Sequence, residues 1–154
     1  MQVDYPALVK HEERFVTTEM IFNRCQRFDV LVHASRNVPR MPLSSKFRTI
    51  YAFEPDIELF MEQMAEGMQP NIYVTLAMLG EQHGPVTYFD GRRIVTVPSL
   101  RLDELTLPCD AIIADDITAL RGAADTIAKH NPVLMVRERI IETAQWLRIR
   151  DGTA

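Results

Sequence analysis

Residues 29–39 read Asp-Val-Leu-Val-His-Ala-Ser-Arg-Asn-Val-Pro, and residues 48–54 read Arg-Thr-Ile-Tyr-Ala-Phe-Glu. The first stretch predicts a buried strand that runs into a turn, and the second predicts a strand that ends on the acid Glu54. This order is typical of a Rossmann-like half that binds a nucleoside cofactor. Ser35 and Pro39, however, stand in the turn where close approach of a ligand to the backbone favours glycine. The frame for a nucleoside site is therefore present without the glycines that would hold the ligand.

Strands and helices alternate outward from this segment. Apolar patterns predict strands over residues 29–34, 48–53, 71–78, 109–114 and 132–136. They predict helices over residues 55–68, 118–130 and 138–150, with one or two amphipathic helices in 7–27. The Asp90-Gly91 turn indicates a small hairpin between residues 86–89 and 93–97. We expect an α/β fold with an open, mostly parallel sheet of about five strands in the order 3-2-1-4-5.

Composition limits the class of protein. The chain has 154 residues, 47% of them hydrophobic and 25% charged, which fits one globular domain. Its net charge of -4 and scattered basic residues argue against a nucleic-acid partner. No signal peptide or membrane span is evident, so we expect a cytoplasmic protein or part of a soluble assembly. Cys25 and Cys109 lack the spacing of a metal site and are predicted to be separate thiols.

Several further segments occur in a recognisable order. They are Ile50-Tyr-Ala-Phe-Glu-Pro-Asp56, Leu76-Ala-Met-Leu-Gly-Glu-Gln-His-Gly-Pro-Val-Thr-Tyr-Phe-Asp90, Leu102-Asp-Glu-Leu105, Asp110-Ala-Ile-Ile-Ala-Asp115, Leu120-Arg-Gly-Ala123 and His130-Asn-Pro-Val-Leu134. Over about residues 28–138 the chain resembles the FkbM family of S-adenosylmethionine-dependent methyltransferases. The resemblance implies a truncated, Rossmann-like class I methyltransferase fold over residues 29–154. The apolar spacing in residues 7–27 predicts an N-terminal helical extension at 1–28 before it. It also implies that Glu54, Asn37 and Asp115 would bind S-adenosylmethionine, with Asp115 as the catalytic residue.

The chain departs from the family at two places in this frame. The family's first strand ends in Asp-Val-Gly-Ala-Asn-Ile-Gly, whereas this chain has His33-Ala-Ser-Arg-Asn-Val-Pro39. Side chains at Ser35 and Pro39 would take up space that the cofactor needs against bare backbone. After the fourth strand the family has Asp-Val-Glu-Gly-Ala-Glu, of which this chain matches the first acid, at Asp115. About one helical turn is missing from the rim of the site.

These losses favour a degenerate, non-catalytic domain that serves as a binding or assembly module, with no cofactor expected. The alternative is an active O-methyltransferase that uses S-adenosylmethionine to modify a hydroxyl of a small molecule or a glycan. The chain also ends before the two strands that usually follow the fifth in a class I methyltransferase. Strand 132–136 is therefore expected to be an apolar sheet edge, which another copy or a different protein would cover.

Polar residues at the predicted strand ends leave other interpretations open. His33, Glu54, Asp115 and Asp116 should converge on one crevice and could in principle hold a metal or supply a base. The simpler interpretation predicts no metal site, with Asp115 or Asp116 as a helix cap and His33 filling the pocket. Two groups of apolar residues complete the predictions. Met61, Met64, Met68 and Met78 are predicted core residues, with a partner-binding surface as the alternative, and Trp146 is predicted to pack on the sheet.

Overall fold

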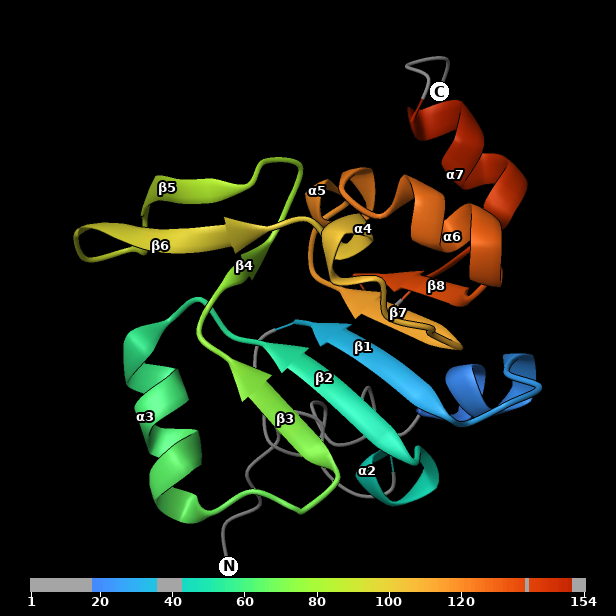
Figure 1. Cartoon of the computed structure of the whole chain (residues 1–154), viewed down its shortest axis with the longest axis horizontal. Helices are drawn as coiled ribbons and strands as arrows, with labels where there is room; N and C mark the ends of the chain where they lie inside the picture. Colours follow the sequence, from blue (N-terminus) through green and yellow to red (C-terminus); the bar gives the residue numbers. More distant parts are fainter. Residues whose placement is uncertain (1–17, 36–42, 138, 151–154) are drawn as a thin grey trace, which may run out of the picture.

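The computed structural model describes residues 18–35, 43–137 and 139–150, which form two sheets flanked by helices (Figure 1). The larger sheet has six strands in the order β3-β2-β1-β7-β8-β9, and the smaller has three in the order β4-β6-β5. The larger sheet consists of β1 (Val30–Ala34), β2 (Thr49–Phe53), β3 (Ile72–Thr75), β7 (Ala111–Ala114), β8 (Val133–Val136) and β9 (Arg139–Ile141). The smaller consists of β4 (Met78–Leu79), β5 (Gly84–Phe89) and β6 (Ile94–Leu100).

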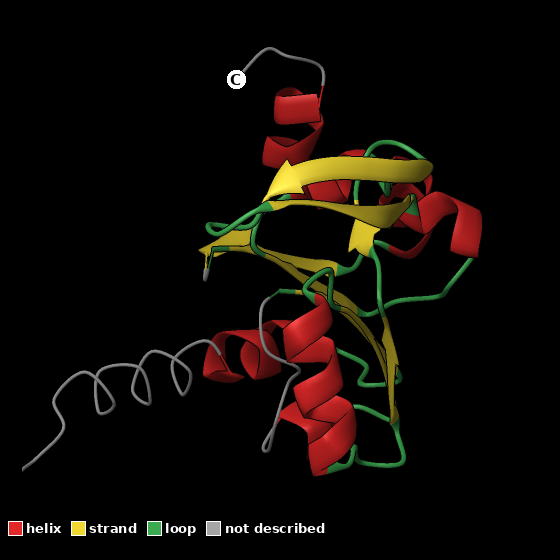
Figure 2. Cartoon of the chain, turned by 90° about the vertical axis from the view of Figure 1, so that its left-hand side faces the viewer, coloured by secondary structure: helices red, strands yellow, loops and turns green. Residues whose placement is uncertain are grey.

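The first five strands of the larger sheet run parallel, in the predicted order. All four residues of the central strand β7 are buried, because helices cover both faces of the sheet (Figure 2). The hairpin predicted from the Asp90-Gly91 turn is present as β5 and β6. The α/β fold class is therefore confirmed. The prediction of one strand over residues 71–78 is wrong, since β3 ends at Thr75 and Met78 begins β4 in the other sheet.

The edge beside β8 differs from the prediction. Residues 139–141 form the strand β9, which pairs antiparallel with β8 and leaves the last helix, α7, to span Thr143–Arg150. The chain reverses at Arg137, whose φ is 51°, and the β-branched Ile140 and Ile141 then favour an extended conformation. The predictions of a helix from residue 138 and of an uncovered edge at 132–136 are therefore wrong. A segment of the same chain covers that edge.

The remaining helices are short apart from one. They are α2 (Leu43–Lys46), α3 (Ile57–Glu66), α4 (Leu102–Leu105), α5 (Thr118–Arg121) and α6 (Ala124–His130), and residues 18–24 are also helical. Asp56 is the N-cap of α3, and its carboxylate accepts hydrogen bonds from the backbone N–H groups of Glu58 and Leu59 at 2.9 and 3.3 Å. The predicted helix 118–130 is divided in two near Gly122. An added Cβ at Gly122 would overlap the carbonyl oxygen of Gly80, so the turn between α5 and α6 meets the residue after β4 through bare backbone.

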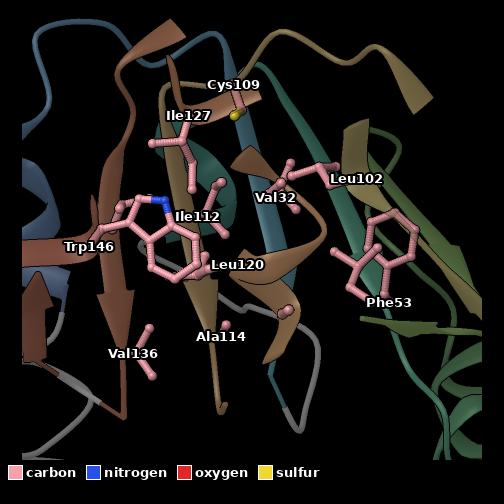
Figure 3. Packing of buried hydrophobic residues seen from close by; sticks show 14 of the residues in the cluster. Val32, Phe53, Leu102, Cys109, Ile112, Ala114, Leu120, Ile127, Val136 and Trp146 are labelled. Atoms are coloured by element: carbon pink, nitrogen blue, oxygen red, sulfur yellow. The ribbon is translucent and has the colours of Figure 1, made fainter. Parts of the chain in front are cut away.

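Two apolar clusters pack on opposite faces of the larger sheet. The first gathers α5, α6 and α7 on one face, where Trp146 is fully buried beside Ile112 and Leu120, as predicted for Trp146 (Figure 3). The second includes Ile21 and Phe47 on the other face. α3 contributes no buried residue, and Met61 is 63% exposed. The prediction that Met61 and Met64 are core residues is wrong, because both side chains lie at the surface.

Three polar side chains tie distant backbone segments together. The Oδ2 atom of Asp110, before β7, accepts hydrogen bonds from the N–H groups of Asp29 and Val30 at 2.9 and 3.0 Å. Asn71, before β3, donates from Nδ2 to two main-chain carbonyls at 2.7 and 2.9 Å. The carboxylate of Asp103 accepts from the N–H and hydroxyl of Thr126 in the first turn of α6. Asp103 thus caps a helix that begins about twenty residues further along the chain.

Candidate functional site

The carboxyl ends of β1, β2 and β7 lie side by side, where open α/β sheets usually bind ligands. His33 is paired in register with Ala52 of β2 and Ile113 of β7. Extending this register by two residues places Ser35 between Glu54 and Asp115. The N–H groups of Glu54 and Asp115 continue the ladder, donating to the carbonyls of Thr75 at 3.0 Å and Ala34 at 3.4 Å. The predicted strand-end residues therefore do gather at one edge.

Ser35 and Asp115 are in direct contact. The Ser35 hydroxyl donates a hydrogen bond to Oδ1 of Asp115 at 2.6 Å, a short distance typical of a bond to a carboxylate. The backbone carbonyl of Asp115 in turn accepts from Nε of Arg137 at 3.1 Å. Sequence reasoning identified Ser35 as a substituted glycine but missed its bond to Asp115. The parallel register of β1 and β7 is the signal that could have indicated it.

His33 is a buried, neutral residue at this edge. Its side chain is only 6% exposed, and its Nδ1 atom has no hydrogen-bond partner within the described part of the chain. Burial lowers the pKa of the imidazole from 6.5 to about 4, although the negative charge of Asp115 opposes the shift. The ring therefore carries no charge near neutral pH. It occupies volume beside the strand ends as an apolar side chain would.

Glu54 and Asp116 differ in their access to solvent. Glu54 is 2% exposed, so its carboxylate is screened from solvent. Asp116 is exposed, and its Oδ1 accepts from both the N–H and the hydroxyl of Thr118 at 2.9 Å, at the start of α5. The backbone hydrogen bond from Thr118 is the main reason that the pKa of Asp116 is lowered. The N-cap residue of α5 is Ile117, so neither acid holds that position. Asp116, one residue earlier, accepts the N–H of Thr118, the first residue of α5.

Other predicted site features bear on the chemistry. Asn37 lies outside the described residues, as does Pro39. Among the described residues, no group of three or more His, Cys, Asp or Glu side chains could hold a metal ion. Cys25 and Cys109 are free thiols, and burial raises their pKa values to about 11 and about 12. Neither thiol would ionise near neutral pH, which removes the nucleophilic form of cysteine.

Comparison with known proteins adds one finding about the fold. No family model matches the sequence, and no curated protein matches it either. The structure is similar to the crystal structure of methyltransferase FkbM from Methylobacillus flagellatus KT, with a TM-score of 0.54 and 15% sequence identity. The similarity covers 81% of this chain. The chain has part of a methyltransferase fold. The resemblance to FkbM methyltransferases is thus confirmed at the level of the fold.

The similarity covers only part of that protein. The matched region spans 36% of the FkbM chain, so this chain corresponds to about a third of its length. At 15% identity the similarity establishes the arrangement of strands and helices and leaves the chemistry to be argued from the residues.

None of the helices in the described ranges is long and apolar enough to cross a membrane.

Proposed function

We propose that this chain is a degenerate, non-catalytic methyltransferase-like domain that serves as a binding or assembly module. The observation that carries the proposal is the 2.6 Å hydrogen bond between the Ser35 hydroxyl and Asp115. The FkbM resemblance aligns Ser35 with a glycine and Asp115 with an acid of the site. In this chain the Ser35 hydroxyl forms a hydrogen bond with the Asp115 carboxylate, which would otherwise be available to a substrate or cofactor.

The surroundings of this bond support the same conclusion. Glu54, which the resemblance assigns to the ribose hydroxyls, is 2% exposed, so a ribose could reach it only after a rearrangement. His33, aligned with another acid of the family, is buried and neutral. A hydrogen bond to a charged group contributes about 1.5–3 kcal/mol. Losing the ribose contacts and one acid would therefore weaken cofactor binding by several orders of magnitude.

The alternative function is an active O-methyltransferase that acts on a hydroxyl of a small molecule or glycan. It is favoured by the sheet order, by the similarity to a methyltransferase, and by two acids kept at the ends of β2 and β7. In this alternative Glu54 would bind the ribose of S-adenosylmethionine, Asn37 would contribute to the cofactor turn, and Asp115 would lie beside the reacting centre. The Ser35 side chain would then have to turn away from Asp115.

Titration calorimetry of the full chain with S-adenosylmethionine and S-adenosylhomocysteine separates the two functions. We expect no measurable heat of binding with either ligand at about 1 mM, a limit that corresponds to about 4 kcal/mol of binding free energy. The Ser35→Gly variant tests the carrying observation, since it removes the side chain and releases Asp115. If the Ser35 side chain blocks the site, this variant binds more tightly than the unmodified chain.

A matched control makes a positive result interpretable. Binding by the unmodified chain tighter than about 100 μM, or about 5.5 kcal/mol, would contradict the degenerate function if the Glu54→Ala variant abolished it. Circular dichroism of each variant confirms that it is folded. Binding that survives Glu54→Ala would point to a surface outside the cofactor frame and would leave the proposal standing.

A further inference from the structure

The turn between β8 and β9 is short, and its sequence fits it poorly. The two strands are paired up to Val136 and Arg139, which leaves two positions for the turn. The sequence supplies Arg137 and Glu138 there. Arg137 has a φ of 51°, in the left-handed region, where a Cβ atom crowds the backbone. Two-residue turns with a positive φ normally carry asparagine, aspartate or glycine at that position, so this hairpin is closed under backbone strain.

Arg137 is anchored on its amino side. Its N–H donates to the carbonyl of Ala114 at 3.1 Å, next to the pairing of β8 with β7. Its Nε donates to the carbonyl of Asp115 at 3.1 Å. Rotation at Arg137 would therefore redirect residues 139–150 and leave β8 in the sheet. Arg137 is thus a pivot between the body of the domain and its C-terminal segment, which we define as residues 139–150.

The C-terminal segment is held by contacts with the body of the domain. Its strand β9 pairs with β8, and the side chain of Trp146 on α7 is fully buried in the first apolar cluster (Figure 3). The hydroxyl of Thr143 donates to Oδ1 of Asn131 at 3.0 Å. All these contacts join the segment to residues that precede the turn. The segment therefore fills its site as a bound peptide would, tethered through Arg137.

We propose that two copies of the chain exchange their C-terminal segments. Each Trp146 would then occupy the same apolar site in the other copy, and each β9 would pair with the other copy's β8. If Arg137 becomes extended, β8 and β9 join into one strand over residues 133–141, about 30 Å long. Two such strands run antiparallel around a two-fold axis next to Arg137. The occupant of each site is the segment that already fills it within one chain.

The exchange creates a contact that the single chain cannot make. Within one chain the pairing of β8 with β9 stops at Val136 and Arg139, because the chain turns there. Between two copies the same register continues and places Arg137 of each opposite position 138 of the other, which is a glutamate. Opposite charges directly across antiparallel strands stabilise the pair. Exchange therefore relieves the left-handed backbone in both chains and adds two pairs of opposite charge.

The turn decides the balance between the monomer and the exchanged dimer, since the other contacts are the same in both. A short tether competes with the second copy at an effective concentration on the order of millimolar. Relief of two strained turns should favour the dimer by about tenfold. We therefore expect a dissociation constant on the order of 100 μM. The inference rests on the proposed function, since it names the partner of the assembly module as a second copy.

Size-exclusion chromatography with light scattering, on the full chain equilibrated from roughly 10 μM to roughly 1 mM, tests the exchange. We expect a dimer fraction that grows with concentration and reverses slowly on dilution, because Trp146 must leave its buried site first. Arg137→Gly removes the strain of the turn and should lower the dimer fraction several-fold. Arg137→Val disfavours a positive φ and should raise it. Both variants lack the guanidinium, so their comparison isolates the backbone preference.

Two results would overturn the proposal at this stage. One is an unmodified chain that stays monomeric over the whole concentration range. The other is an equal dimer fraction in Arg137→Gly and Arg137→Val, because a dimer formed through any other surface would not respond to the backbone preference at the turn. Circular dichroism of both variants confirms that they are folded.

Cross-linking distinguishes exchange from other dimers. Chains carrying Asn131→Cys are mixed with chains carrying Thr143→Cys at a concentration where the dimer forms, because these two side chains are in contact. A short thiol cross-linker should join position 131 of one copy to position 143 of the other, and mass spectrometry of the joined peptides separates this product from links through Cys25 or Cys109. Met61→Cys in place of Asn131→Cys is the control, because Met61 is exposed on α3. A dimer that gives no link between positions 131 and 143 would overturn the exchange.

Failure of the proposed function would appear in a different measurement. A monomeric chain that binds no S-adenosylmethionine would reject the exchange and retain the proposed function. S-adenosylmethionine binding that the Glu54→Ala variant abolishes would reject the proposed function, whether or not the segments exchange.

Discussion

Asp110 and Asp115 flank the same four-residue strand, β7, and they act in different ways. At the amino end, one carboxylate oxygen of Asp110 accepts two main-chain N–H groups at the start of β1. At the carboxyl end, the exposed carboxylate of Asp115 accepts the Ser35 hydroxyl. The first contact depends on the path of the backbone and the second on the identity of one side chain. The amino end of the sheet thus fixes the backbone of β1 beside β7, whereas the contact at the carboxyl end depends on which side chain follows β1.

The same division extends to the neighbouring strands. Asn71, at the amino end of β3, donates to the main-chain carbonyls of Ser44 and Phe47. His33, at the carboxyl end of β1, is buried with its Nδ1 unpaired among the described residues. Buried polar atoms without a hydrogen-bond partner reduce stability, so the amino ends stabilise the fold and the carboxyl ends cost some of that stability. Such a cost is common where a sheet once positioned a ligand or still does.

The largest expected effect is a loss of stability in acid through His33. Burial lowers its pKa in the folded protein to about 4 from the usual 6.5, so between these pH values the unfolded chain binds a proton that the folded protein does not. The contribution is constant above about pH 6.5, and stability falls as the pH drops toward 4. At about 1.4 kcal/mol for each pH unit between the two pKa values, the free energy of unfolding should fall by about 3 kcal/mol.

Urea unfolding at several pH values between 7 and 4 measures this loss. The His33→Leu variant has no titrating group at that position and should show a flatter dependence on pH. The His83→Gln variant is the control, because it removes a histidine whose side chain is 62% exposed. If His33→Leu lost as much stability in acid as the unmodified chain, other groups would be responsible for the loss. The burial of His33 at the carboxyl end of β1 would then not reduce the free energy of unfolding in acid.

The next largest effect should come from the amino end. Asp110→Ala removes the acceptor of two charge-assisted hydrogen bonds and leaves the N–H groups of Asp29 and Val30 without it. We expect the free energy of unfolding to fall by about 2–3 kcal/mol. Asp110→Asn keeps an acceptor oxygen without the charge and should lose about half as much. Equal losses in the two variants would show that charge, and not hydrogen bonding to the backbone, gives Asp110 its role.

The sequence predicted the central strands because each is a run of apolar residues long enough to be recognised. It also predicted the hairpin from the Asp90-Gly91 turn and the burial of Trp146. It did not predict β9, because Arg139–Ile141 is only three residues long and its isoleucines also fit the helical spacing that leads to Trp146. Helical spacing likewise placed Met61 in a core. The spacing identifies an apolar face but not whether any part of the fold packs on it.

The candidate site was predictable in position and less so in detail. Strand ends that carry His33, Glu54 and Asp115 must meet at one edge once the sheet order is known, and they do. The bond from Ser35 to Asp115 joins residues eighty positions apart, so it follows from strand register and not from local spacing. The structural role of Asp110 depends on a contact of the same kind. The spacing of apolar residues along the sequence therefore cannot predict these long-range hydrogen bonds.

The smallest effect on the free energy of unfolding should come from Asp115, at the carboxyl end of β7. Asp115→Ala should lower the free energy of unfolding by no more than about 1 kcal/mol, because its carboxylate is exposed and water can replace the Ser35 hydroxyl. A double-variant cycle with Ser35→Ala isolates their bond, and the coupling measured by urea unfolding should stay below about 1 kcal/mol. A cost as large as that of Asp110→Ala would make Asp115 a structural residue. The Ser35–Asp115 bond would then hold the fold together, and its evidence for a lost catalytic site would disappear.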